Sequence, residues 1–300
     1  MITTRAFMGQ TWTDLNSPTK EEVDSLVLTQ NINPIVAKDL ITPTPTQYAK
    51  DEGNMIYMVL HIPLFKRPHL AVVSQEVDFI ISSNGVVTGR YDSIDALHYF
   101  TKQIEVNEIL NRGQNVHLFF GIMNEIYTVM TDELSHTEDW MREIEKNIFE
   151  GREKEMVFAI SNAGRNILNF RRIIEPHGNI LEFLKETGRE KFGLKFESEA
   201  KTLIEEWRRI MKVVDNQSDL AVELRETNNS LLSTKQNEIM KTLAVIGSVL
   251  LPLSIIGQIF GMSIHNFPLI DDPNAFWIII GLMIIVVVTM LTYAKIKKWM

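Results

Sequence analysis

The chain has 300 residues and a formal net charge of −8, which argues against a nucleic-acid-binding protein because such proteins need a basic face. It contains no cysteine, so disulfides, thiolate metal sites and cysteine nucleophiles are excluded. The opening segment, residues 1–7, lacks the apolar stretch of a signal peptide, so we expect the N-terminal part to stay in the cytosol.

Residues 1–114 read as a cytosolic α/β domain. Alternating, apolar and β-branched residues predict strands over 10–15, 54–63, 76–82 and 86–90. A Ser-Asn-Gly turn joins the last two as a hairpin. Ser17 or Thr19 is expected to cap a helix that has acidic residues in its first turn. No Gly-rich phosphate loop follows a strand, so we expect no nucleotide site.

Residues 115–242 read as a cytosolic helical region. Apolar residues recur at helical spacing over 118–134, and the acidic stretch that follows is most simply a solvated helix face. Between Gly193 and Gly247 there is neither glycine nor proline, so the sequence predicts one long stalk helix that continues into the first hydrophobic stretch. Asn228-Asn229-Ser230 is the weakest point of this helix.

Residues 243–300 are predicted to form a transmembrane hairpin. Its spans cover about 243–260 and 275–294, each long enough to cross a bilayer, and residues 261–274 form the outer loop. The loop has no lysine or arginine, whereas lysines flank the other end of each span. These are Lys235, Lys241, Lys295, Lys297 and Lys298. The positive-inside rule therefore predicts a cell (plasma) membrane protein with both termini in the cytoplasm.

One face of the first span carries polar and small residues at alternating steps of three and four. This stripe comprises Asn237, Met240, Ala244, Gly247, Leu251, Ser254, Gln258 and Gly261. Hydroxyl and amide groups are costly in hydrocarbon, so the stripe either lines a pore or forms a contact between helices. The stripe carries no charge, and neutral polar groups suit a cation that keeps its water shell, as Mg²⁺ does.

The order of motifs resembles the CorA family of magnesium transporters. The segments that carry the resemblance are Asn237-Glu238-Ile239-Met240-Lys241, Leu250-Leu251-Pro252-Leu253 and Ile259-Phe260-Gly261-Met262. Two apolar spans and a lysine-rich end complete the pattern. Shorter matches upstream are Trp12-Thr13-Asp14-Leu15 and Phe170-Arg171-Arg172, so the resemblance covers essentially the whole chain.

The resemblance implies a homopentamer with a cytosolic funnel, in which the first spans line a pore and the second spans lie outside them. By position in the family, the pore-lining residues are Asn237, Met240, Leu251 and Ser254. Gln258 joins them from the polar stripe, although the family usually has a small residue at that position.

The outer mouth of the implied pore is Gly261-Met262-Ser263. The family motif is Gly-Met-Asn, whose amide meets the hydrated ion, so Ser263 offers a shorter hydroxyl and a wider ring. Asn266 is near enough in sequence to supply the missing amide. His265 lies beside the mouth, where it either responds to zinc or pH or is incidental.

The family also implies regulatory divalent ions held by acidic residues between cytosolic domains. The candidates on the stalk are Glu205, Glu206 and Asp215, with Asp78 or Asp92 contributed by a neighbouring subunit. The alternative interpretation is that these are ordinary surface carboxylates.

The sequence thus predicts passive transport of a divalent cation across a lipid bilayer, with Mg²⁺ as the leading ion and as a possible regulatory ligand. One alternative is transport of Zn²⁺, Co²⁺ or Ni²⁺ by the same fold. Another is a non-conducting membrane-anchored sensor or scaffold. We expect no enzyme and no organic cofactor, because no nucleophile, metal triad or phosphate loop stands out.

Overall fold

The structure, a computed structural model, describes residues 2–7, 9–30, 32–66, 71–91, 94, 96–102, 117–262 and 274–297. The chain divides into two compact units, Met1–Arg225 and Glu226–Met300. The long helix α7 (Leu194–Gly261) contributes to both units.

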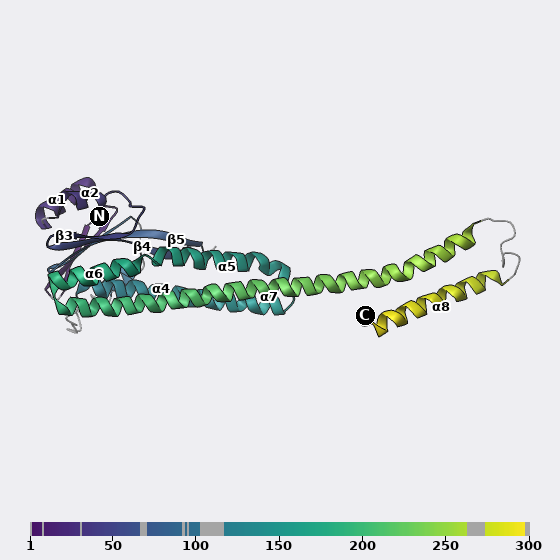
Figure 1. Cartoon of the computed structure of the whole chain (residues 1–300). Coiled ribbons are helices and arrows are strands. Elements are labelled where there is room, and N and C mark those ends of the chain that lie inside the picture. Colours follow the sequence, from purple (N-terminus) through teal and green to yellow (C-terminus); the bar gives the residue numbers. More distant parts are fainter. Residues whose placement is uncertain are drawn as a thin grey trace. The chain divides into compact units, whose positions relative to one another are not determined.

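A six-stranded sheet lies at the centre of the α/β part of the first unit (Figure 1). Its strands are β1 (Ile2–Phe7), β2 (Gln10–Asn16), β3 (Tyr48–Glu52), β4 (Met55–Lys66), β5 (Ala71–Ser82) and β6 (Gly85–Arg90). They lie in the order β1-β2-β6-β5-β4-β3, and each neighbouring pair is antiparallel except β2 with β6. The predicted strands and the β5–β6 hairpin are confirmed, and β1 and β3 are additional.

Helices α1 (Lys20–Gln30) and α2 (Pro34–Asp39) cover one face of the sheet (Figure 1). Thr19 Oγ1 accepts the N–H of Glu22 at 3.3 Å, and Glu22 Oε2 accepts the N–H of Thr19 at 3.0 Å. This reciprocal capping box makes Thr19, rather than Ser17, the cap of α1. The core under these helices includes Leu15, Val23, Leu26, Val36, Leu40, Tyr57, Val59 and Ile80.

The other face of the sheet packs on helices α4 (Leu118–Phe149), α5 (Glu153–Ile174) and α6 (His177–Phe192), as Figure 1 shows. Phe79 of β5 meets Phe119 of α4 edge to face, with ring centroids 5.5 Å apart. The first part of α7 packs closely on α6, because an added Cβ at Gly178 would lie 2.4 Å from the Trp207 ring. The predicted helical region is therefore a layer that supports the sheet.

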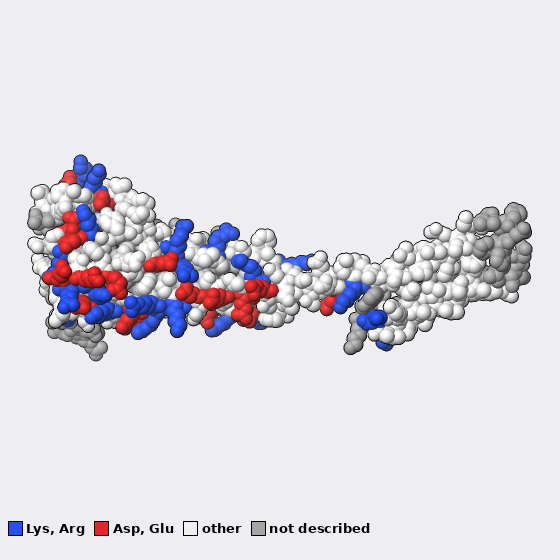
Figure 2. Space-filling view, in the orientation of Figure 1, with Lys and Arg blue, Asp and Glu red and all other residues white. Residues whose placement is uncertain are grey.

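In the second unit, α7 continues without a break from Asn228-Asn229-Ser230 to Gly261, so the prediction of one long helix is confirmed. Helix α8 (Ala275–Ile296) follows. Both helices are long and apolar enough to cross a membrane, as predicted. Figure 2 shows acidic and basic side chains interspersed over the helices of the first unit, whereas the two spans themselves carry no charged residue.

Candidate functional site

The polar stripe of the first span is exposed along α7. The exposed members are Asn237, Met240, Ala244, Leu251, Ser254, Gln258 and Gly261, and only Gly247 is partly covered. Met262, which follows the helix, is also exposed. The structure therefore leaves these side chains free for a contact that the single chain does not make.

Helix α8 covers a different face of α7. Val245 of α7 and Ala294 of α8 are only 5% and 2% exposed. An added Cβ at Gly257 would lie 3.8 Å from Met283 Cε of α8. The residues of α7 that are partly covered include Ser248, Val249, Pro252, Leu253, Ile256 and Phe260. At about 3.6 residues per turn, this seam and the centre of the polar stripe lie roughly half a turn apart.

The polar stripe and the face covered by α8 are different faces of α7. This difference helps to decide whether the stripe lines a pore or packs against another helix. If the stripe served packing within one chain, Ser254 and Gln258 would face α8, yet both are exposed. An unpaired amide facing hydrocarbon costs several kcal/mol, in order of magnitude. The stripe therefore requires another partner: water, an ion or a second copy of α7.

Pro252 lies inside α7 at the level of this stripe. Proline has no N–H, so the carbonyl four residues earlier, that of Ser248, loses its helical hydrogen bond. The hydroxyl of Ser248 donates to the Val245 carbonyl at 2.8 Å. The helix thus lacks one of its regular backbone hydrogen bonds within the membrane segment.

The expected outer mouth is only partly placed. Gly261 ends α7 and, like Met262, is exposed. Ser263, His265 and Asn266 lie outside the residues that the structure describes.

The stalk carboxylates do not gather into a metal site within one chain. Glu205 is exposed, Glu206 Oε1 accepts from Arg209 Nη1 at 2.9 Å, and Asp215 Oδ1 lies 3.1 Å from Arg171 Nη1. No group of three His, Asp or Glu side chains suited to a metal occurs among the described residues. Asp92 lies outside them.

The assignment of Asp78 as a ligand offered to a neighbouring subunit is wrong. Asp78 is 0% exposed in β5, and its Oδ1 accepts the Tyr57 hydroxyl at 3.3 Å. Burial, reinforced by Glu76, raises the pKa of Asp78 well above its usual value. The carboxyl is therefore a core group.

A second polar site, around His61 and Glu76, is absent from the sequence predictions. The two residues are fifteen positions apart on different strands and lie opposite each other only through the β4–β5 register. No local spacing signals such a pair.

The described architecture is that of a membrane protein with an α/β domain, a long helix and a C-terminal pair of spans. A family model described as "CorA-like Mg2+ transporter protein" matches residues 8–298. The chain therefore belongs to the CorA-like Mg²⁺ transporter family, which confirms the resemblance. The family consists of transporters rather than enzymes, in agreement with the sequence analysis.

Individual relatives are distant in sequence and close in fold. A cobalt/magnesium transport protein CorA of Thermotoga maritima is 22% identical over 90% of this chain and 77% of its own. A protein of the same description from Methanocaldococcus jannaschii is 22% identical over 83% of this chain and 78% of its own length. The complete structure of the CorA magnesium transporter from Methanocaldococcus jannaschii superposes with a TM-score of 0.84 at 19% identity, covering 97% of this chain and 92% of that one.

Proposed function

We propose that the protein is a passive divalent cation transporter, with Mg²⁺ as its ion, and that the α7 stripes of five identical subunits line the pore. The observation that carries the proposal is the position of the stripe. It is exposed on the face of α7 that α8 leaves open, in a chain of a transporter family.

The chemistry of the stripe supports a hydrated ion. Asn237, Ser254 and Gln258 offer amides and a hydroxyl but no carboxylate. Mg²⁺ gives up its water reluctantly, so a lumen that hydrogen-bonds the water shell passes the ion without holding it. A ring of carboxylates would bind the bare ion tightly and slow its release.

We further propose that the protein lies in the cell membrane with both termini in the cytoplasm. Lys235, Lys241, Lys295 and Lys297 support this orientation, because lysines favour the cytoplasmic side of a span. A membrane potential that is negative inside then drives cations towards the cytoplasmic α/β domain. The driving free energy is about 2.3 kcal/mol per elementary charge for each 100 mV.

Co²⁺ is the second candidate ion, because the names of two relatives include cobalt with magnesium. Zn²⁺ and Ni²⁺ transport, and a non-conducting scaffold, are outcomes that the same experiment separates.

The test measures the mass of the purified assembly and the entry of Mg²⁺, Co²⁺, Zn²⁺ and Ni²⁺, each offered alone, into vesicles under an inside-negative potential. We expect a pentamer and potential-dependent Mg²⁺ entry that Gln258→Leu reduces strongly. Thr289→Val on α8 is the matched control, because its hydroxyl donates only to the Ile285 carbonyl of its own helix at 2.7 Å. A monomer or dimer excludes the pore, and a pentamer without cation entry identifies a scaffold.

A further inference from the structure

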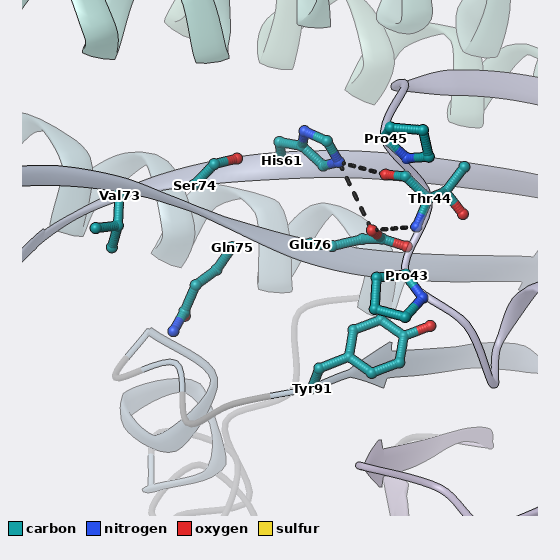
Figure 3. Close-up of a pocket in the computed structure, with 9 residues that line it drawn as sticks. All are labelled: Pro43, Thr44, Pro45, His61, Val73, Ser74, Gln75, Glu76 and Tyr91. Atoms are coloured by element: carbon teal, nitrogen blue, oxygen red, sulfur yellow. Dashed lines mark hydrogen bonds and ion pairs between the residues drawn. The ribbon is translucent and has the colours of Figure 1, made fainter.

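Two cavities of the chain differ in chemistry. The one beside β4 and β5 is polar, and its carboxylate, Glu76, already accepts the backbone N–H of Thr44 at 2.6 Å (Figure 3). The other, of about 290 Å³, is a groove between α7 and α8. The walls of this α7–α8 groove are Thr242, Val245, Ile246, Val249, Leu250 and Leu291. Apart from one hydroxyl they are apolar, so the groove suits a hydrocarbon ligand.

The α7–α8 groove is a recess rather than a plain apolar surface. Val245 is only 5% exposed, whereas Leu250 and Leu291 are 55% and 39% exposed. The single hydroxyl, that of Thr242, donates to the Glu238 carbonyl of its own helix at 3.0 Å. An occupant of the groove therefore contacts carbon atoms.

The groove lies at the end of the hairpin that carries lysines. The two spans run in opposite directions, so the start of the first and the end of the second lie together (Figure 1). Lys241 is one helical turn before Val245 on α7, and Lys295 is one turn after Leu291 on α8. Both lysines are exposed. Their ammonium groups therefore lie beyond the same end of the groove.

Basic side chains outnumber acidic ones at this end. Residues 235–241 and 295–297 hold the lysines Lys235, Lys241, Lys295 and Lys297 and one carboxylate, Glu238. Figure 2 shows charged side chains here, next to spans that carry none. An apolar groove that ends in a net positive charge is complementary to a molecule with a hydrocarbon tail and an anionic head.

We propose that the α7–α8 groove binds an acyl chain of an anionic phospholipid, whose phosphate is held by Lys241 and Lys295. Lysine stems are apolar, so the ammonium groups reach the level of the head groups while the stems stay in hydrocarbon. Phosphate oxygens accept charge-assisted hydrogen bonds from ammonium groups. A zwitterionic head group is attracted less, because it carries an ammonium group of its own that repels the lysines.

The lipid is compatible with the proposed pore. The groove and the polar stripe share no residue, so a bound acyl chain leaves the stripe open. With the orientation proposed above, the lipid belongs to the cytoplasmic leaflet. The inference rests on the two spans lying in a bilayer and not on the passage of an ion.

A second copy of the chain is the less favoured occupant. In an assembly of identical subunits, a neighbouring hairpin would bring the same lysines to the same depth of the membrane. Like charges repel, whereas a lipid phosphate neutralises them. The charge at this end therefore favours a lipid.

The experiment is native mass spectrometry of the full-length protein in detergent, which counts the lipids bound to the assembly. Phosphatidylglycerol and phosphatidylcholine with the same acyl chains are added separately at graded concentrations. We expect one phosphatidylglycerol per chain, bound about tenfold more tightly than phosphatidylcholine. Equal binding of the two lipids overturns the proposal.

Two variants test the two parts of the site. Leu291→Trp fills the groove with an indole ring and should remove one phosphatidylglycerol per chain. Lys241→Gln combined with Lys295→Gln removes both ammonium groups and should weaken phosphatidylglycerol binding by about tenfold or more. Wild-type binding by either variant overturns the proposal, because the lipid then lies elsewhere or is not held by its phosphate.

Each variant has a matched control. Leu282→Trp controls for the indole ring, because Leu282 lies on α8 outside the groove and is 43% exposed, much as Leu291 is. Lys154→Gln combined with Lys212→Gln removes the same charge from exposed positions of the first unit. Both controls should bind phosphatidylglycerol as wild type does, and an equal loss in a control and its test variant overturns the proposal.

The same spectra report the mass of the assembly, so they show whether each variant stays intact. If wild type binds no lipid and Leu291→Trp loses subunits, a second copy fills the groove and the proposal is overturned. Cation entry is not part of this measurement, so a negative result leaves the proposed transport function standing.

Discussion

Arg171 Nη1 on α5 lies 3.1 Å from Asp215 Oδ1 on α7, so one of the proposed regulatory carboxylates already has a cation beside it. Both side chains are about half exposed, and such pairs contribute less than about 1 kcal/mol to stability. If Asp215 binds a regulatory ion, that ion therefore replaces the guanidinium at small cost.

This relationship gives a prediction for regulation by Mg²⁺. If Asp215 is the ligand of a Mg²⁺ ion that inhibits transport, Arg171→Gln frees the carboxylate and should lower the Mg²⁺ concentration needed for inhibition. Asp215→Asn should raise that concentration while changing the free energy of unfolding by less than about 1 kcal/mol. Vesicle flux at graded internal Mg²⁺ measures both effects. Identical inhibition curves would make Asp215 an ordinary surface carboxylate.

The contact between Gly178 and Trp207 predicts a strong effect of one methyl group. A Cβ at Gly178 would meet ring atoms at 2.4, 2.6 and 2.9 Å, and Trp207 Nε1 is held by its bond to the Ile174 carbonyl at 3.0 Å. We expect Gly178→Ala to lower the free energy of unfolding by about 1–3 kcal/mol, as overpacking does.

Gly164→Ala is the matched control for that variant. Its nearest neighbour is the flexible end of Arg225 at 3.4 Å, so alanine should be neutral or stabilising by up to about 1 kcal/mol. Chemical denaturation of the full chain in detergent measures both. Equal stabilities for the two variants would mean that the Trp207 ring moves freely.

Sequence patterns predicted β2 from its alternation and β4, β5 and β6 from their apolar and β-branched residues, and all four strands include a buried run. They did not indicate β1 and β3, which are the two edges of the sheet. Each edge strand has only exposed and half-covered positions, without a fully buried residue. An edge strand therefore lacks the apolar signal from which a strand is recognised.

The same distinction applies to the sites. The stripe that includes Ser254 and Gln258 follows from helical periodicity, which is local in sequence. The pairing of His61 with Glu76 depends on the register of two strands, and so does the burial of Asp78. That register pairs Asp78 with Val59, in the part of the sheet that α1 and α2 cover. A Cβ at the neighbouring Gly89 would lie 2.9 Å from Leu40 Cδ2 and 3.3 Å from Asp78 Cβ, so the glycine leaves space for both side chains. A spacing rule cannot reveal which carboxylate becomes a core group and which lines a cavity.

His177 predicts how stability depends on pH. The carbonyl of His61 accepts from Nε2, so Nδ1 is the acceptor for the Tyr127 hydroxyl at 3.1 Å and the ring is neutral. Burial lowers the pKa of His177 from 6.5 to about 4. The unfolded chain therefore binds more protons in this window, and stability falls as the pH drops from about 6.5 to about 4.

The expected loss from His177 is about 3 kcal/mol across that window. His61 acts in the opposite direction, because the stability from its raised pKa is present at low pH and is lost as the pH rises through that pKa. Comparing the pH slope of His177→Gln with that of wild type isolates the His177 contribution, and His136→Gln, at an exposed position, is the control. An unchanged slope in His177→Gln would contradict a buried neutral ring.

The remaining prediction concerns the outer mouth of the proposed pore, which the family resemblance assigns to Gly261-Met262-Ser263. The serine hydroxyl can bond an ion's water, but it reaches less far than the amide of the family motif. Ser263→Asn should therefore change the rate of Mg²⁺ entry or its preference over Co²⁺, and Ser263→Ala, which removes the hydroxyl, should reduce Mg²⁺ entry. Both are measured as potential-driven flux into vesicles, with Thr289→Val on α8 as the control. Because either change alters the donors and acceptors offered to the hydrated ion, wild-type flux and selectivity in both variants would show that Ser263 does not meet the ion.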